Sequence, residues 1–163
     1  MVDVYVGLGS NIRPERNLVA AVAALERSFG ELRCSRVYRS PPYGFEGRDF
    51  LNLVVAFEND APTPVIEDVL SALERAAGRG EQEQRGGSRT LDLDLLLLGR
   101  RVDPAERLPR EDVLLYPFVL APLVELADEL RHPVTGLALA AAWRQMAATQ
   151  PPLHCVGTLR SLA

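Results

Sequence analysis

The central stretch of the chain reads Arg89-Thr90-Leu91-Asp92-Leu93-Asp94-Leu95-Leu96-Leu97-Leu98. Its alternation predicts a β-strand, because successive side chains of an extended strand point to opposite faces. Asp92 and Asp94 then share one face, and Leu91, Leu93 and Leu95 line the other. Two carboxylates held this close repel each other unless a proton or a cation lies between them, and Mg²⁺ prefers such oxygen ligands. The stretch therefore predicts a strand with a metal site; the alternative is an edge strand whose two acids face solvent beside Arg89.

The chain before this stretch alternates between strand and helix patterns. We expect strands at 2–8, 32–38 and 50–58, since each is a short, largely apolar run that ends near a turn signal. Apolar residues at helical spacing predict helices at 14–29 and 64–77, each with proline in its first turn and glycine after its last.

After the central stretch, two further helices are expected around 116–127 and 137–147, followed by a proline-rich tail with little pattern. The order strand, helix, strand, strand, helix, strand predicts an α+β protein rather than a doubly wound one. We expect a ferredoxin-like α/β sandwich: a mostly antiparallel sheet with helices packed on it and C-terminal helical additions.

The basic side chains restrict the chemistry. All 18 cationic residues are arginine, so no mechanism that needs a P-loop, Schiff-base or catalytic lysine is available. The turn Gly7-Leu8-Gly9-Ser10-Asn11 resembles the start of a dinucleotide-binding fingerprint, but Ile12 stands where the third glycine would be. Any phosphate chemistry must therefore depend on arginine, metal and backbone groups.

Charge and cysteine content limit the partners and the compartment. The formal net charge of −4 over 163 residues counts against nucleic-acid and membrane binding. Cys34 and Cys155 have no spacing typical of a disulfide scaffold or a zinc site, which favours a reducing compartment. Neither a signal peptide nor a membrane-spanning segment is expected, so we expect a cytoplasmic protein.

Two loops carry polar groups toward the acid pair. The segment 78–89 is polar and holds four glycines, with Arg79, Arg85 and Arg89 available to bind phosphate oxygens. The segment Ser40-Pro41-Pro42-Tyr43-Gly44 is stiffened by adjacent prolines, which would hold its backbone groups out toward a ligand. The alternatives are solvated surface arginines and a rigid connector.

Taken together, several segments resemble the hydroxymethyl-dihydropterin pyrophosphokinase family of folate biosynthesis. The matching segments are Gly7 to Asn11, Ser40-Pro41-Pro42, Phe50-Leu51-Asn52, Gly78-Arg79, Arg89 to Asp94 and Phe118-Val119-Leu120-Ala121-Pro122-Leu123. The resemblance spans nearly the whole length and implies one pyrophosphokinase domain over residues 1–163. It also implies the reaction: the two terminal phosphates of ATP move together to the pterin hydroxymethyl group, which leaves AMP.

The resemblance assigns roles to individual residues. Asp92 and Asp94 would bind two Mg²⁺ ions that bridge the triphosphate. Catalytic roles around the phosphates fall to Arg79 and Arg89, and we add Arg110, which stands where the family has a histidine. The ATP-binding positions would be Glu74, Arg79, Arg89, Leu95 and Arg110, and the pterin-binding positions Ser40, Pro41, Tyr43, Phe50, Asn52 and Phe118. Phe50 and Phe118 would stack on the pterin while Asn52 reads its edge; the alternative is that both rings are core aromatics. Only small-molecule substrates and a monomer are expected.

This chain departs from the family pattern at some positions. Arg110 and Glu111 follow Leu108-Pro109 where most members have a His-Tyr-like pair, and Tyr116 stands in place of an arginine. Glu81 and Gly86 also differ from the usual arginine and bulky aromatic. We expect Arg110 to take over the histidine's phosphate contact and partly offset the change at Tyr116. The rival hypotheses are a catalytically impaired pterin or nucleotide binder and a different two-metal enzyme.

Overall fold

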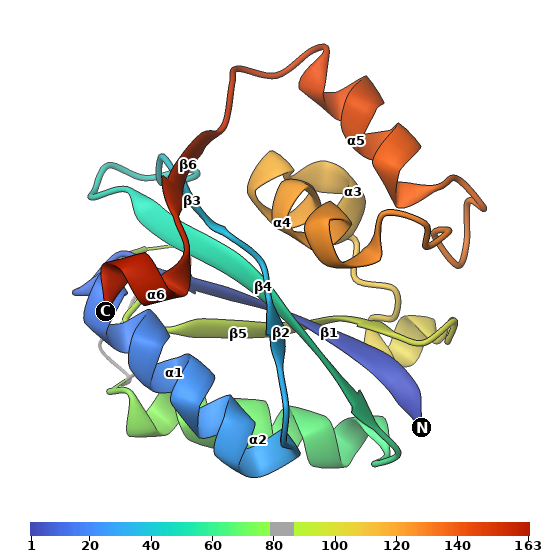
Figure 1. Cartoon of the computed structure of the whole chain (residues 1–163), viewed down its shortest axis with the longest axis horizontal. Coiled ribbons are helices and arrows are strands. Elements are labelled where there is room, and N and C mark those ends of the chain that lie inside the picture. Colours follow the sequence, from blue (N-terminus) through green and yellow to red (C-terminus); the bar gives the residue numbers. More distant parts are fainter. Residues whose placement is uncertain (79–86) are drawn as a thin grey trace.

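A six-stranded antiparallel sheet forms the centre of the protein (Figure 1). The computed structural model describes residues 1–78 and 87–163. The strands are β1 (Val2–Ser10), β2 (Arg33–Cys34), β3 (Val37–Ser40), β4 (Phe50–Asn59), β5 (Asp92–Leu98) and β6 (His154–Gly157). They lie in the order β5-β1-β4-β3-β6, and β2 pairs with β4 beside β3. The strand that carries the acid pair is therefore at one edge of the sheet.

Helices cover both faces of the sheet. They are α1 (Pro14–Phe29), α2 (Thr63–Ala76), α3 (Asp112–Leu115), α4 (Pro117–Ala127), α5 (Leu139–Ala147) and α6 (Leu159–Leu162), with a 3-10 turn, η1, at Pro104–Glu106. Figure 1 shows α1 and α2 together on one face and α3, α4 and α5 on the other. No helix in the described ranges is long and apolar enough to cross a membrane.

Strand alternation gives each face its own apolar core. On the face of α1 and α2, the buried side chains include Val6, Leu53 and Leu95. On the opposite face, Val54 and Leu96 pack with buried residues of α4 and α5. A fully buried leucine contributes about 1.5–3 kcal/mol, so the two cores together hold the sheet between its helical layers.

The leucine run of β5 explains why the acids lie at one end of that strand. Leu93 and Leu95 are buried in the core beneath α1 and α2, while Leu96 and Leu97 are buried in the core beneath α4 and α5. Only the first half of β5 therefore has a face that the helices leave open. Asp92 and Asp94 occupy that half, with side chains 33% and 38% exposed.

The structure confirms the expected α+β sandwich, with two local differences. The strand expected at 32–38 is divided at Ser35. The hydroxyl of Ser35 accepts a hydrogen bond from the backbone N–H of Val54 at 2.9 Å, in the place of a backbone carbonyl of the neighbouring strand. The tail, expected to have little pattern, adds β6 to the edge of β3 and places α6 against α1. Both differences depend on contacts with distant parts of the chain.

A buried histidine, His132, lies in the segment that connects α4 to α5. His132 is 6% exposed, and its Nδ1 accepts hydrogen bonds from the backbone N–H groups of Val134 and Thr135, both at 3.2 Å. Burial lowers the pKa of His132 from its ordinary value of 6.5. The folded state therefore favours the neutral ring, and the unfolded state takes up the proton first as the pH falls.

We accordingly expect His132 to make its full contribution to the free energy of unfolding above pH 6.5. That contribution should be lost as the pH falls from there toward the lowered pKa of His132. Chemical denaturation between pH 7.5 and 5 measures this slope. The variant His132→Gln should flatten it, whereas His154→Gln, which changes an exposed histidine, should leave it intact. A slope that survives in His132→Gln would assign the effect to other groups.

Candidate active site

The acid pair lies in register with polar and small residues on the neighbouring strands. Asp92 of β5 pairs with Gly9 of β1, and Gly9 pairs on its other side with Asn52 of β4. Asp94 pairs with Gly7 in the same way. Because paired residues in an antiparallel sheet point to the same face, Asp92 and Asn52 stand on either side of Gly9, about 10 Å apart across two strand spacings.

Gly7 and Gly9 keep the floor between these side chains open. A Cβ atom at Gly9 would lie 3.2 Å from Oδ1 of Asn52, and one at Gly7 would lie 3.4 Å from Cδ1 of Leu96. The sequence suggested a tight turn at 7–11, but both glycines lie within β1, where their lack of a side chain lets a ligand approach the backbone. The floor therefore connects the acids to the amide of Asn52.

A cleft of about 380 Å³ opens above the acid pair. It is bounded by β5 and by the segments 40–50 and 112–118. Its lining residues are Ser40, Pro41, Tyr43, Phe45, Phe50, Gly87, Arg89, Asp92, Asp94, Asp112, Tyr116 and Phe118. A smaller cavity of about 80 Å³ continues from it over Gly7 and Gly9 to Asn52. Carboxylates, arginine and aromatic rings thus share one concave site.

Aromatic rings line the side of this cleft away from the acids. Phe118 stacks on Tyr116 with ring centroids 5.1 Å apart and planes 16° apart, and Tyr43 meets Tyr116 edge-on at 5.4 Å. Phe45 meets Phe50 edge-on at 6.3 Å. Phe50 and Phe118 are both half-buried, so neither is a core aromatic. Rings arranged in this way suit a flat heterocycle.

Asn52 is held in one orientation by β3. Its side chain is 7% exposed, and its Nδ2 donates to Oγ of Ser40 at 2.8 Å and to the carbonyl of Tyr38 at 3.2 Å. The hydroxyl of Tyr38 in turn donates to Glu125 of α4 at 2.5 Å. Burial, together with the hydrogen bond to Glu125, raises the pKa of Tyr38 to about 12, so the hydroxyl remains a donor at neutral pH. This network fixes β3 against α4 and orients the amide.

An arginine lies beside each acid of the pair. The Nε of Arg89 is 3.7 Å from Oδ1 of Asp92, and the Nη2 of Arg110 is 3.2 Å from Oδ1 of Asp94. The Nε of Arg110 is 3.4 Å from Asp112, a charge contact without hydrogen-bond geometry. Arg110 therefore connects Asp94 to a third carboxylate that the sequence did not single out.

This end of the site is rich in negative charge. Burial raises the pKa of Glu67 on α2, and the nearby charges of Asp94 and Glu74 add to the effect while Arg110 opposes it. Arg110 thus compensates several acids at once. Among the described residues, these carboxylates would repel an anionic ligand, and a cation bound beside them would relieve that repulsion.

The backbone of Arg89 is held by Asn11, the residue that directly follows β1. The side-chain Oδ1 of Asn11 accepts from the backbone N–H of Arg89 at 2.7 Å, and the N–H of Asn11 donates to the carbonyl of Arg89 at 3.0 Å. The Nδ2 of Asn11 also donates to Ser88 at 3.2 Å. The guanidinium of Arg89, on a residue only 8% exposed, is consequently presented to Asp92 from a fixed backbone.

Two residues that the resemblance places near ATP lie along the free edge of β5. Glu74 accepts a hydrogen bond from the backbone N–H of Leu93 at 3.1 Å through its Oε2. The side chain of Leu95 is 1% exposed and packs in the core on the face opposite the acids. Leu95 can therefore meet a ligand only through its backbone, which by strand alternation points to the same edge as that of Leu93.

The structure brings most of the predicted positions together. The cleft is lined by Ser40, Pro41, Tyr43, Phe50, Arg89, Asp92, Asp94 and Phe118, with Asn52 in the adjoining cavity and Arg110 beside Asp94. The predicted roles of Arg79, Glu81, Arg85 and Gly86 lie outside the described residues. Asp112 and Phe45 line the cleft but were missed; their only signals in the sequence were an acid two residues after Arg110 and a large aromatic in a polar loop.

The acids fit a magnesium ion only together with other ligands. Across 1–78 and 87–163, no three His, Cys, Asp or Glu side chains converge on one metal position. Asp92 and Asp94 offer hard oxygen donors on one open face, which suits an ion that keeps several waters and takes further oxygens from a substrate. The donor set thus fits a metal that arrives with a phosphate ligand.

Comparison with known proteins gives one consistent family. The family model described as 7,8-dihydro-6-hydroxymethylpterin-pyrophosphokinase (HPPK) matches residues 5–128. The chain is 35% identical to the Haemophilus influenzae 2-amino-4-hydroxy-6-hydroxymethyldihydropteridine pyrophosphokinase, covering 82% of this chain and 86% of that protein. The protein of the same name from Pseudomonas aeruginosa is 39% identical, with 80% and 83% of the two chains covered.

Solved structures share the fold. A crystal structure of HPPK-DHPS in complex with substrates matches with a TM-score of 0.71 at 11% identity, over 91% of this chain and 44% of that chain. Wild-type Plasmodium falciparum HPPK-DHPS matches with a TM-score of 0.64 at 12% identity, over 90% and 45%. The chain thus spans less than half the length of these two proteins.

Proposed function

Because the chain belongs to the 7,8-dihydro-6-hydroxymethylpterin-pyrophosphokinase family, we propose that the cleft above Asp92 and Asp94 is its active site. The protein is a transferase of folate biosynthesis that moves pyrophosphate from ATP to 6-hydroxymethyl-7,8-dihydropterin and leaves AMP. The observation that carries the assignment of the site is the row Asp92, Gly9 and Asn52, which sets a pair of acids and a fixed amide on one open floor.

The pterin would lie at the aromatic end of the cleft. Phe50 and Phe118 would stack on its two faces, which requires Phe118 to exchange some of its contact with Tyr116 for the heterocycle. Asn52 would read the pyrimidinone edge, and the backbone of Ser40, Pro41 and Tyr43 would supply further hydrogen bonds. The separation of about 10 Å between Asn52 and the acids leaves room for two fused rings and a one-carbon arm.

The triphosphate would lie over the acid pair. Asp92 and Asp94 would hold two Mg²⁺ ions, which supply the positive charge that phosphates need in this acidic region and help align them with the attacking hydroxyl. Asp112, which lines the same cleft, is placed to accept a hydrogen bond from water in this shell. Glu74 would fix the free edge of β5 while the backbone of Leu95 meets the nucleotide.

Two described arginines would act on the phosphates. Arg89, held by Asn11, would neutralise charge that develops on the transferred group. Arg110 would release Asp94, which would then bind the metal, and would turn its guanidinium toward a phosphate. Each member of the present ion pair would thereby gain a stronger partner. Arg79 is proposed for a similar role from the resemblance alone.

Replacing Arg110 with alanine should lower kcat/KM for ATP by about tenfold to a hundredfold, since a charge-assisted contact to phosphate is lost. The same variant leaves Asp94 and Asp112 with one cation fewer, so we expect it to bind Mn²⁺ more tightly when no nucleotide is present. Steady-state kinetics and Mn²⁺ titration by electron paramagnetic resonance measure the two effects.

Arg101→Ala is the matched control for Arg110→Ala, because Arg101 is exposed and pairs with Asp103 and Glu106 outside the cleft. It should change neither quantity by more than about twofold. Full turnover and unchanged ATP affinity in Arg110→Ala would contradict the proposed compensation.

The experiment that tests the function is a product assay. The protein is mixed with ATP, Mg²⁺ and 6-hydroxymethyl-7,8-dihydropterin, and the nucleotide product is identified. AMP that forms only when the pterin is present supports the proposal. ADP would indicate a single-phosphate kinase, and binding of both substrates without AMP would indicate the catalytically impaired homologue.

We also propose a single-domain monomer over residues 1–163 that acts in the cytoplasm and binds neither nucleic acid nor membranes. The net charge of −4 supports the absence of nucleic-acid binding. Cys34 and Cys155 are both free thiols, which is compatible with a reducing compartment. Light scattering coupled to size-exclusion chromatography tests the oligomeric state directly.

A further inference from the structure

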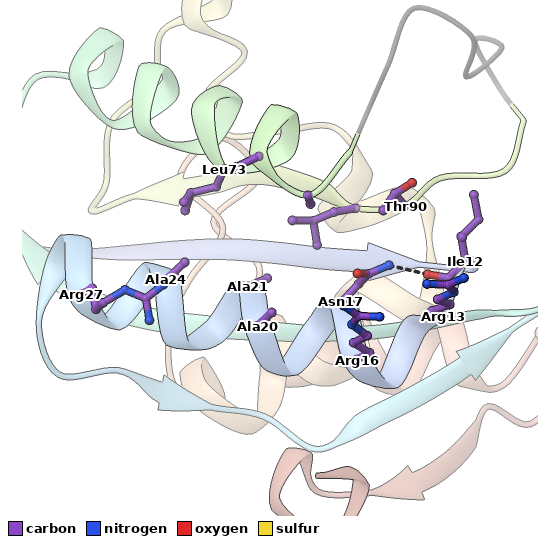
Figure 2. A pocket seen from close by; sticks show the side chains of 13 residues that line it. Ile12, Arg13, Arg16, Asn17, Ala20, Ala21, Ala24, Arg27, Leu73 and Thr90 are labelled. Carbon is purple, nitrogen blue, oxygen red and sulfur yellow. Dashed lines mark hydrogen bonds between the residues drawn. The ribbon is translucent and has the colours of Figure 1, made fainter.

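A second concave site lies on the other face of the sheet, between α1 and α2 (Figure 2). Its volume is about 530 Å³, larger than the cleft above the acid pair. Its apolar part includes Ala20, Ala21 and Ala24 of α1 and Leu73 and Ala76 of α2. The volume falls within the range of about 300–1,000 Å³ that is typical of small-molecule sites.

All charged side chains that line this groove in the described part of the chain are cationic: Arg13, Arg16 and Arg27. Arg13 and Arg16 lie at the start of α1, and Arg27 lies about 16 Å from Arg16 along the helix, given a rise of about 1.5 Å per residue. None of the three forms an ion pair with a described residue. At 100° per residue, the acids of α1, Glu15 and Glu26, fall on the far side of the helix.

The described lining of the groove carries only positive charge, although the net charge of the chain is −4. Arg13 and Arg16 are three residues apart and repel each other, and no carboxylate in that lining offsets them. An anion in the groove would relieve that repulsion. Guanidinium groups pair with phosphate through two parallel hydrogen bonds, whereas the alanine floor favours an apolar or flat body.

We propose that the groove is a second binding site, for a small organic phosphate of nucleotide size. Its phosphates bind Arg13 and Arg16, its body lies on Ala20 and Ala24, and Arg27 closes the far end. Asn17 lies in the same wall, with its amide turned to the carbonyl of Ile12 (Figure 2). The site is separate from the acid pair and does not depend on the function proposed above.

The groove adjoins the active site along the chain. Thr90 and Leu91 line it, while their neighbours Arg89 and Asp92 line the cleft on the other face. Ile12 also lines it and follows Asn11, which is hydrogen-bonded to Arg89. Occupation of the groove should therefore be detectable at Arg89 as well as at α1.

The test is a titration of the full chain with ADP in the absence of Mg²⁺, followed by two-dimensional NMR of backbone amides and arginine Nε groups. We expect shifts at Ala20, Ala24 and Arg27 that saturate together. The double variant Arg13→Ala/Arg16→Ala should weaken this binding by at least about tenfold. The control Arg100→Ala/Arg144→Ala removes the same charge from exposed positions away from α1 and α2 and should leave it unchanged.

Further probes separate the sources of affinity. Tripolyphosphate that binds as well as ADP would mean that the arginines alone define the site and that inorganic polyphosphate is an equivalent ligand, which contradicts the role of the alanine floor.

The variant Ala24→Glu places an acid among the arginines and should abolish ADP binding in the groove. Shifts confined to Asp94, Arg110 and Phe118 in the wild-type protein, or unaltered affinity in the double variant, would overturn the proposal.

Discussion

Replacing Asp94 with asparagine is expected to lower the rate of AMP formation by at least about a thousandfold, equivalent to about 4 kcal/mol of transition-state stabilisation. Asparagine has the shape of aspartate but no charge, so the pairing of Asp94 with Gly7 in the sheet is kept. What is lost is the negative charge of a metal ligand, because the amide oxygen of asparagine is a neutral and weaker ligand for Mg²⁺. The barrier rises because the metal, and with it positive charge beside the phosphates, is held less firmly.

The measurement is single-turnover formation of AMP, together with Mn²⁺ affinity in the presence of α,β-methylene ATP. Asp68→Asn serves as the matched control, since it makes the same change on an exposed residue of α2. It should retain full activity. Undiminished turnover in Asp94→Asn, or Mn²⁺ affinity equal to that of the wild type, would defeat the metal assignment.

The sequence predicted the acid face correctly because strand alternation is a local property. The alternation of Asp92, Leu93 and Asp94 fixes which side chains share a face, whatever else the chain does. The same reasoning predicted that Leu95 points away from the acids, and it is buried on the other face. The family resemblance alone indicated which of these residues act on a nucleotide.

What the local pattern could not predict are the pairings between distant segments. No local signal places Gly9 opposite Asp92, because register depends on how β1 and β5 meet, and these two residues are 83 positions apart in the chain. Asp112 was missed for the same reason: it follows an irregular link whose path is decided by contacts with β5, such as the hydrogen bond from the N–H of Arg110 to the carbonyl of Leu96. The strand at His154–Gly157 likewise forms only because β3 offers it an edge.

The second large effect is expected at Asn52. Replacement with alanine should weaken pterin binding by about 10²–10³-fold, because a site built to hydrogen-bond a heterocycle loses Oδ1, the acceptor of the amide that Ser40 and Tyr38 leave available to the ligand. ATP affinity should stay within about twofold, since the acids lie about 10 Å away across Gly9. Some loss of stability is also expected, about 1–3 kcal/mol, because the buried hydroxyl of Ser40 and the carbonyl of Tyr38 lose their donor.

Calorimetric titration with the pterin in the presence of α,β-methylene ATP measures the affinity, and denaturation in urea measures the stability. Ser40→Ala separates the two effects: it removes the 2.8 Å bond that orients the amide but leaves the amide itself. Because the bond to Tyr38 remains, we expect pterin affinity in Ser40→Ala to fall by about tenfold at most. If Asn52→Ala weakened ATP and pterin binding equally, the residue would be supporting the sheet rather than reading the substrate, and the pterin would have to bind elsewhere in the cleft.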